Sequence, residues 1–247
     1  MNFEKIIILG QGRVAKKCQE IASEFFKTKI DYIESKKENF KYFNKFFNGL
    51  KNCFIVSANS FYIFKKECVL NNSIINYHNS LLPKHKGVNA HVFCIFDNDE
   101  KSGITWHKVD CNIDTGDILA QGEIILDKQI TSLKLLNLQH NLAINTFSKA
   151  LTNFKNNSCF KQEMGGGWHK FKDIPNDGFL KLSWSKEKIS SFLRAMNMGF
   201  QRSLPYAKIK LFEKEYEVLF YELNEKSLIL HLSDDMKISI TKEKTCN

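Results

Sequence analysis

The sequence lacks the features of membrane, secreted and metal-binding proteins. No apolar run approaches the roughly 18 residues that cross a bilayer, and the apolar run at residues 6–9 is shorter than a signal-peptide core of at least ~7 residues. The seven cysteines are odd in number, widely spaced and never form Cys-x-x-Cys, which predicts neither a disulfide framework nor a zinc site. We therefore expect a cytoplasmic protein with free thiols, no membrane contact and no bound metal.

Internal repeats and low-complexity tracts are also missing. The glycine run at residues 165–167 is not followed by the Lys-Ser/Thr pair of a P-loop, so it predicts a flexible crossing between domains and not a phosphate cradle. The composition is ordinary for a soluble globular chain, with 43% hydrophobic and 26% charged residues. At 247 residues the chain is long enough for one sizeable core and a smaller appended unit.

Basic residues outnumber acidic ones, which gives a formal net charge of +9. This balance suits a polyanionic partner such as tRNA, or a diphosphate-bearing nucleotide sugar, and it discriminates poorly between them. The chain is rich in Lys, Asn, Ile and Phe, whose codons are A/T-rich, so genome composition could account for part of the lysine excess. Charge therefore carries little weight in the functional assignment.

A strand, a tight glycine turn and a helix are predicted at the start of the chain. The apolar residues 5–9 precede Gly10-x-Gly12-x-x-Ala15, and an amphipathic run follows to residue 26. This spacing is also the dinucleotide-binding fingerprint, for which Asp31 or Glu34 would be the ribose acid. The same turn opens any doubly wound sheet that begins with a strand and a helix, so a non-catalytic dinucleotide-binding Rossmann protein is the less favoured interpretation.

Apolar periodicity predicts alternating strands and helices along most of the chain, which is the α/β class. We expect strands at residues 30–33, 53–57, 73–78, 103–109 and 117–125, and helices at 65–70, 89–96 and 131–154. Thr131 or Ser132 can cap the last helix. Residues 40–50 are a helix or an irregular cover, with phenylalanines at helical spacing that indicate core packing.

The composition changes after residue 156, where breakers become frequent. We expect an N-terminal domain at residues 1–160, a linker at 161–185 and a small C-terminal α+β module at 186–247. Ser185 is the predicted N-cap of a helix that runs to Ala195. Residues 206–240 alternate between apolar and polar side chains in three or four short runs, as small antiparallel strands do.

The residues that can do chemistry lie between Asn76 and Leu119. Asn76 and His78 are two apart on the expected strand 73–78, so their side chains emerge on one face near its end, and Asp114 lies in a later polar turn. Each alone could be structural. Together, an amide, an imidazole and a carboxylate suffice for acyl transfer to an amine, because they supply an oxyanion donor, a proton acceptor and an orienting charge.

This region resembles the folate-dependent formyltransferases. The resembling residues are Asn76-x-His78-x-Ser80-Leu81-Leu82-Pro83, Gly87, Gly103-x-Thr105 and Asp114-x-Gly116-x-Ile118-Leu119. The match is ordered and spans about forty positions. It implies that Asn76, His78 and Asp114 are the catalytic trio, that N10-formyltetrahydrofolate donates the formyl group, and that the sheet is Rossmann-like, twisted and mostly parallel. A second resembling segment runs from Trp184-Ser185 to Arg194-Ala195.

The resemblance also implies where the two substrates bind. In the family a loop with the motif Ile-Leu-Pro holds the pterin ring through backbone groups, and Ile63-Phe64-Lys65 is the matching segment here. The implied folate contacts are Phe61, Tyr62, Ile63, Phe64, Asp110 and Ile113. The implied acceptor contacts are Gly12, Arg13, Ser80 and Lys84. Core packing of the phenylalanines and solvent exposure of Arg13 and Lys84 are equal alternatives.

The expected acceptor is the primary amine of a nucleotide-linked amino sugar, a dTDP-3- or dTDP-4-amino-dideoxyhexose used to build O-antigen lipopolysaccharide or another surface glycan. Similar sugar N-formyltransferases are often dimers, so a homodimer is expected. Methionyl-tRNA is the alternative acceptor, supported by charge and opposed by the tail of about fifty residues after Ala195. Nucleic acid is therefore not the expected partner. As the proton acceptor, His78 needs a pKa near neutral, which the charge of Asp114 is expected to raise.

Overall fold

The computed structural model describes residues 2–199 and 204–241, which form two compact units. The first unit takes in the chain up to Ala90, then Lys101–Ile125 and Leu136–Lys170. The second takes in His91–Glu100, Leu126–Leu135 and the chain from Phe171. Two stretches on the N-terminal side of residue 160 thus pack with the C-terminal part of the chain, because the units follow packing and not chain order.

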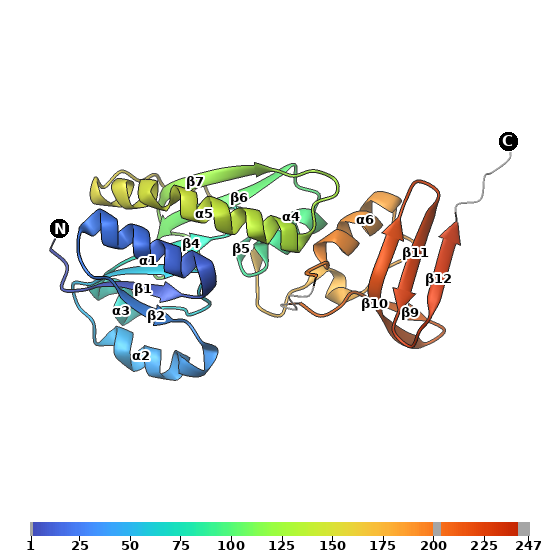
Figure 1. The fold of residues 1–247 in the computed structure, drawn as a ribbon, viewed down its shortest axis with the longest axis horizontal. Coiled ribbons are helices and arrows are strands. Elements are labelled where there is room, and N and C mark those ends of the chain that lie inside the picture. Colours follow the sequence, from blue (N-terminus) through green and yellow to red (C-terminus); the bar gives the residue numbers. More distant parts are fainter. Residues whose placement is uncertain (1, 200–203, 242–247) are drawn as a thin grey trace. The chain divides into compact units, whose positions relative to one another are not determined.

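A six-stranded sheet organises the first unit, with the order β2-β1-β3-β4-β6-β7 (Figure 1). Its strands are β1 (Ile6–Gly10), β2 (Asp31–Glu34), β3 (Phe54–Ala58), β4 (Ser73–His78), β6 (Lys101–Lys108) and β7 (Ile118–Ile125). The first four are parallel, whereas β6 and β7 are antiparallel to their neighbours. This is the expected mostly parallel α/β sheet, and the expected strands lie within one or two residues of the observed ones.

Helices cover both faces of this sheet (Figure 1). Helices α1 (Gly12–Phe26) and α5 (Ser132–Lys155) pack on one face, in a core that includes Phe54, Trp106 and Phe147. On the other face lie η1 (Lys37–Asn39), α2 (Phe40–Asn48) and α3 (Lys66–Asn71), around a second core. The phenylalanine stripe of residues 40–50 is therefore a helix that packs into the core. Helix α4 (Ala90–Phe96) follows β5.

The glycine turn between β1 and α1 is required by close packing. A Cβ on Gly10 would lie 1.8 Å from the backbone oxygen of Ala58 and 2.8 Å from Cβ of Ala15. Gly10 therefore lets β1, β3 and α1 approach one another at the edge where the parallel strands end. This packing explains the first glycine of the fingerprint without a bound dinucleotide.

The glycine-rich segment after α5 is held by hydrogen bonds, contrary to the expected flexible crossing. Strand β8 (Trp168–His169) pairs in parallel with β5 (Lys86–Gly87), and Lys86 Nζ donates to the Gly165 oxygen at 2.9 Å. A Cβ on Gly166 would lie 1.7 Å from the Pro83 oxygen. The glycine run allows close approach to the loop after β4.

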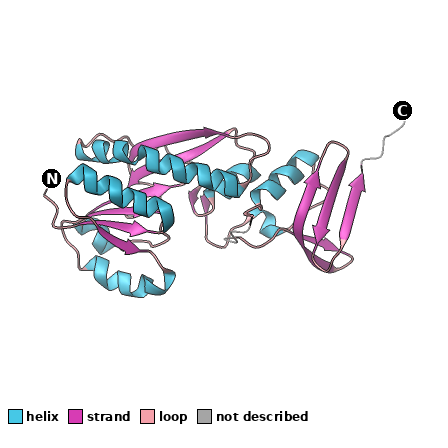
Figure 2. Ribbon diagram, viewed as in Figure 1, coloured by secondary structure: helices cyan, strands magenta, loops and turns pink. Residues whose placement is uncertain are grey.

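The second unit contains an antiparallel sheet (Figure 2), whose strands have the order β12-β11-β10-β9. From Phe171 onward the elements of this unit are η2 (Pro175–Gly178), α6 (Lys186–Ala195), β9 (Lys208–Leu211), β10 (Lys214–Leu223), β11 (Ser227–Leu232) and β12 (Lys237–Thr241). The side chain of Ser185 caps α6 by accepting from Lys188 N, as the sequence predicts. The core of this unit includes Phe192, Leu193 and Leu230.

Two further expectations concern membranes and thiols. Within the described residues, none of the helices has the length and apolar character that a membrane crossing requires. The six cysteines of the described ranges are free thiols, while Cys246 lies outside those ranges.

Candidate active site

The pairing of β4 with β6 gathers polar side chains on one face of the sheet. Asn76 lies opposite His107, and His78 lies opposite Thr105. The alternate positions, including Ile75 and Trp106, face the core under α1 and α5. Because directly opposed residues of antiparallel strands are close neighbours, this register places two histidines and an amide together where β4 ends.

Asp114 reaches the same place from the loop between β6 and β7. Its backbone is left-handed, with φ of 54°, a conformation that Asp tolerates better than most residues. Asp110 Oδ1 accepts from Thr115 Oγ1 at 2.6 Å, and Gln162 Nε2 donates to the backbone oxygen of Asp114 at 3.0 Å. These contacts fix the turn that presents the carboxylate.

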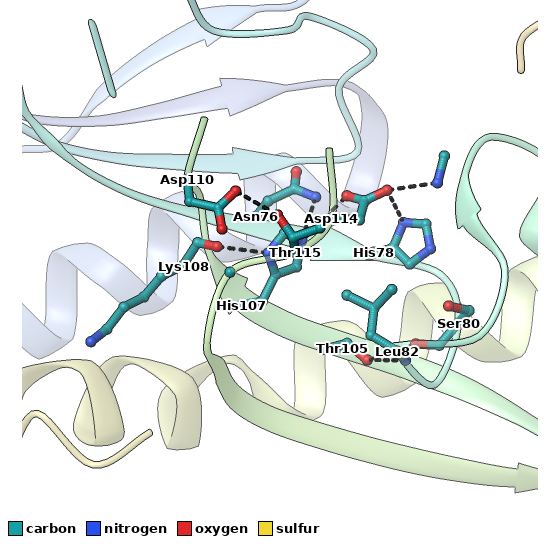
Figure 3. A network of polar contacts seen from close by, with 12 residues as sticks. Asn76, His78, Ser80, Leu82, Thr105, His107, Lys108, Asp110, Asp114 and Thr115 are labelled. Carbon is teal, nitrogen blue, oxygen red and sulfur yellow. Dashed lines mark hydrogen bonds and ion pairs between the residues drawn. The ribbon is translucent and has the colours of Figure 1, made fainter. Parts of the chain in front are cut away.

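The Asp114 carboxylate lies between the two histidines (Figure 3). Its Oδ2 is 3.4 Å from His78 Nδ1 and accepts from Gly87 N at 2.7 Å. Its Oδ1 is 3.4 Å from His107 Nε2, which is also 3.2 Å from Asn76 Nδ2. The structure therefore brings Asn76, His78 and Asp114 to one spot, with Asn76 joined to Asp114 through His107.

Burial and charge together set the ionisation of this cluster. Burial raises the pKa of Asp114, but its polar neighbours, His78 first among them and the Gly87 N–H included, outweigh burial and hold that pKa below its ordinary value. Burial lowers the pKa of His78 and outweighs the opposing charge of Asp114. Asp114 thus acts on the His78 pKa in the expected sense, but burial, which the sequence does not show, makes the net change a decrease. At neutral pH the site holds a carboxylate beside a neutral imidazole.

Sequence reasoning missed His107. The side chain is 2% exposed and contacts two of the three predicted residues. The signal that could have found it is its place on the strand of Gly103-x-Thr105, two residues after Thr105 and therefore on the same face. Only the register with β4 shows that this face meets Asn76.

The loop after β4 is held by buried hydrogen bonds. Thr105 Oγ1 donates to the Ser80 oxygen at 2.7 Å and accepts from Leu82 N at 3.0 Å. Ser80 is 2% exposed, and its hydroxyl donates to the Lys84 oxygen at 2.6 Å. The Ser80 side chain thus stabilises the loop, and its contact with the acceptor stays a prediction. Lys84 is exposed on the same loop.

The predicted folate contacts divide into two groups. Tyr62 and Phe64 pack with Phe47 in an aromatic cluster, with ring centroids 5.3 Å apart in each case. The side chains of Phe61 and Ile63 are 53% and 61% exposed on the same loop. Ile113 is 38% exposed on the Asp114 loop, whereas Asp110 is engaged within that loop. The Tyr62 side chain is buried, whereas that of Phe64 is half-buried.

The predicted acceptor contacts at the start of α1 lie at the edge where the parallel strands end. Gly12 has φ of 63° with open space where a Cβ would be. Arg13 is exposed, and its Nη2 donates to Asn141 Oδ1 on α5. In the described part of the chain no three His, Cys, Asp or Glu side chains are grouped to hold a metal ion.

Comparisons with known proteins agree with this geometry. The model of the formyl transferase family matches residues 10–151. A GDP-perosamine N-formyltransferase of Brucella melitensis is 28% identical over 144 residues, which cover 58% of this chain and 54% of that protein. A methionyl-tRNA formyltransferase of Rickettsia felis is 33% identical over 146 residues, which cover 58% and 48%. The chain thus spans about half the length of the curated relatives it matches.

Solved structures resemble this one over nearly its whole length. An N-formyltransferase of Helicobacter canadensis, in complex with folinic acid and dTDP-3-aminofucose, has a TM-score of 0.73 at 21% identity and covers 97% of this chain and 99% of its own. A sugar 3N-formyl transferase in the presence of dTDP and 5-N-formyl-THF has a TM-score of 0.71 at 22% identity, with complete coverage of both chains. These likenesses show the fold. The matched segment makes up more than half of the sequence and contains every residue of the polar cluster, and we conclude that the chain belongs to the formyl transferase family.

Proposed function

We propose that this chain transfers the formyl group of N10-formyltetrahydrofolate to the primary amine of a nucleotide-linked amino sugar, a dTDP-3- or dTDP-4-amino-dideoxyhexose. The observation that carries the proposal is the convergence of Asn76, His78 and Asp114 at the end of β4, in a chain of this family. Similarity to a GDP-perosamine N-formyltransferase and to structures that contain folate and dTDP compounds supports the substrate classes.

The trio has the groups that this reaction needs. The amine nitrogen bonds to the formyl carbon, and the bond from that carbon to folate N10 then breaks. The tetrahedral intermediate carries one negative oxygen, for which an Asn76 N–H is the donor. Neutral His78 takes the proton that the amine releases and passes it, directly or through a water, to N10 as N10 leaves, so that atoms and charge balance and His78 returns to its neutral form.

His78 has partners on both ring nitrogens before substrate binds. Its Nε2 lies 2.8 Å from the His85 oxygen, so Nε2 carries a hydrogen, and Nδ1 faces Asp114. A base directed at the acceptor needs the opposite tautomer, with the proton on Nδ1 toward Asp114 and the lone pair on Nε2. We expect this tautomer to form when the acceptor amine replaces the His85 carbonyl at Nε2.

The chain also has groups that fit the two substrates. Phe61 and Ile63 have exposed apolar side chains next to the backbone groups of their loop. A pterin ring can contact the apolar side chains with its face and the backbone groups with its polar edge. Arg13 and Lys84 are exposed cations at the same edge of the sheet and suit the diphosphate of a nucleotide sugar. Asp110 supports folate binding indirectly, because its hydrogen bond to Thr115 fixes the shape of the Asp114 loop. Ile113 adds an exposed apolar side chain on that loop.

A second candidate acceptor is methionyl-tRNA. The 33% identity to a methionyl-tRNA formyltransferase and the net charge of +9 favour it. The two solved sugar formyltransferases that match 97% and 100% of the chain favour the sugar. We propose the sugar, acting in the cytoplasm as a homodimer in surface-glycan or O-antigen synthesis.

Incubation with N10-formyltetrahydrofolate and a panel of acceptors tests the proposal. The panel contains dTDP-, GDP- and UDP-linked 3-amino and 4-amino sugars and charged initiator tRNA, and mass spectrometry reads the gain of one formyl group. We expect formylation of a dTDP-amino sugar and none of methionyl-tRNA. Formylation of the tRNA alone would replace the proposal with its alternative, and formylation of no amine would refute both.

A further inference from the structure

His107 lies outside the proposed trio but contacts two of its members. It faces Asn76 across the pairing of β4 with β6, and its side chain is 2% exposed. Its Nε2 lies 3.2 Å from Asn76 Nδ2 and 3.4 Å from Asp114 Oδ1. The proposed reaction gives this histidine no task of its own, so its contacts point to an action through its neighbours.

The other ring nitrogen determines where the His107 proton resides. Nδ1 lies 2.8 Å from the backbone oxygen of Lys108. A carbonyl oxygen can only accept, so Nδ1 carries a hydrogen and donates it, and Nε2 of the neutral ring is an acceptor. The nearer group to Nε2 is the Asn76 amide, whose Nδ2 lies at 3.2 Å, whereas Asp114 Oδ1 lies at 3.4 Å and, as a carboxylate oxygen, has no hydrogen to donate.

This hydrogen bond selects one orientation of the Asn76 amide. The oxygen and nitrogen of an amide have similar size, so a neighbouring group must decide which way it faces. If Asn76 turned its oxygen to Nε2, two acceptors would meet at the 3.2 Å now spanned by Nδ2 and Nε2. Nε2 therefore keeps the NH2 group on its own side. One N–H is used by His107, and the second N–H is left for another acceptor.

We propose that His107 is a positioning residue: with its proton on Nδ1, it fixes through Nε2 the amide of Asn76 that stabilises the oxyanion. The Lys108 carbonyl orients His107, and His107 orients Asn76. The effect on rate rests on the proposed formyl transfer, whereas the proton position does not. One experiment therefore tests the proton position, and two kinetic experiments test the effect on rate.

The first experiment reads the tautomer by NMR on the whole chain. The seven histidines are labelled with ¹⁵N, and long-range ¹H–¹⁵N correlations give the protonation of each ring nitrogen. The signals of His107 are those missing from the His107→Gln variant. We expect a protonated Nδ1 and an unprotonated Nε2 at neutral pH. A protonated Nε2, in the other tautomer or in the imidazolium form, would overturn the inference.

The second experiment compares His107→Leu with His107→Gln. Leucine removes the acceptor, whereas the terminal oxygen of glutamine can accept from Asn76 near the place of Nε2. We expect kcat to fall about tenfold in the leucine variant with little change in either KM, as for a lost hydrogen bond of about 1.4 kcal/mol, and to recover in the glutamine variant. His140→Leu is the matched control, since His140 Nε2 is buried without a hydrogen-bond partner among the described residues; it should keep the wild-type rate.

A double-mutant cycle with Asn76→Ala decides how His107 acts. If His107 works through Asn76, adding His107→Leu to Asn76→Ala should cost less than about twofold in kcat. An equal, roughly tenfold loss in both backgrounds would overturn the inference, because His107 would then act without Asn76. If the wild-type chain transfers no formyl group, the proposed function fails, and the tautomer alone decides the inference.

Discussion

Each oxygen of the Asp114 carboxylate faces a different part of the site. Oδ2 meets His78 and the Gly87 N–H, while Oδ1 meets His107. The Gly87 N–H stabilises the ionised form whether or not a histidine is charged, and this contributes to the lowered pKa of Asp114. Asp114 therefore carries its charge throughout the proposed reaction and holds the His78 ring in place.

Replacing Asp114 with asparagine should stop the reaction without unfolding the protein. Asparagine has the same shape, and its oxygen can still accept from Gly87 N, but it carries no charge to stabilise the His78 imidazolium. We expect kcat to fall by about 10²–10³, as for other preorganised groups at developing charge, with KM nearly unchanged. Steady-state kinetics and a thermal melt measure the two effects; a variant with wild-type kcat would refute the role of Asp114.

The pH dependence of kcat/KM should report the lowered pKa of His78. The base must be neutral, so activity is lost as the pH falls through that pKa, which burial places below the ordinary 6.5. We expect an acid limb below pH 6.5. Two acceptors whose amines have different pKa values provide the control, since the His78 limb stays fixed while the amine limb moves. An acceptor-independent limb above pH 6.5 would contradict the account.

At this scale the sequence predicts what is local and misses what depends on register. Asn76 and His78 follow from strand alternation, and their nearness to Asp114 follows from the resemblance to a family. His107 could not be predicted, since its contact with Asn76 depends on which residues of β4 and β6 pair. The hydrogen bond of the Ser80 hydroxyl to the Lys84 oxygen could not be predicted for the same reason, since the sequence does not specify the path of that loop.

Among the elements, the short pairing of β5 with β8 has the most direct bearing on the site. Gly87 in β5 donates its N–H to Asp114, and its neighbour Lys86 donates through its backbone N–H to the Gly167 oxygen at 2.8 Å. The segment at residues 165–169 is therefore a support for the strand that contacts Asp114. It reaches this position because Gly166 fits against the Pro83 carbonyl.

Of two alanine substitutions in the glycine run, one should lower the stability of the protein and the other should leave it unchanged. Gly166 has φ of +81°, and a Cβ there would lie 1.7 Å from the Pro83 oxygen, so Gly166→Ala should cost about 1–3 kcal/mol of stability. Gly167→Ala is the matched control, because its nearest neighbour would be His169 Nε2 at 4.0 Å. Hydrogen exchange of the Lys86 and Val88 amides measures the effect, with loss of protection expected only for Gly166→Ala. Equal protection in the two variants would count against the supporting role.

Elements with a repeated apolar pattern could be predicted, and elements without one could not. Strand β4 and helix α6 lie where periodicity and the Ser185 cap place them. Strands β5 and β8 have two residues each, which is too short for any period, and they form only because distant segments meet. The glycine run was expected to be flexible because breakers signal a lack of local structure, not a lack of tertiary contact.

On the scale of the whole molecule, the chain has separate hydrophobic cores. Phe54 and Trp106 belong to a core of the first unit, whereas Phe192 and Leu230 belong to the core of the second. The second unit also includes residues 91–100 and 126–135. Composition predicts a small C-terminal module at residues 186–247, but it gives no sign that two earlier stretches pack with the chain from Phe171, because packing partners distant in sequence leave no compositional signal.

Truncating a side chain in one core should destabilise mainly that unit. Phe192 is fully buried, so Phe192→Ala should cost the second unit about 3–5 kcal/mol. Leu219 on β10 is 49% exposed, and Leu219→Ala should change stability by less than about 0.5 kcal/mol. Hydrogen exchange in β11 and β1 compares the units. Equal loss of protection in both strands would show that they unfold as one.

The most direct test of the central claim follows the formyl carbon itself. N10-formyltetrahydrofolate labelled with ¹³C in the formyl group is mixed with a dTDP-amino sugar and either the wild-type chain or Asp114→Asn, and ¹³C NMR records the products. We predict a formamide signal on the sugar nitrogen with the wild type and almost none with the variant. Labelled formate in place of the formamide, or equal formamide with both proteins, would contradict the account.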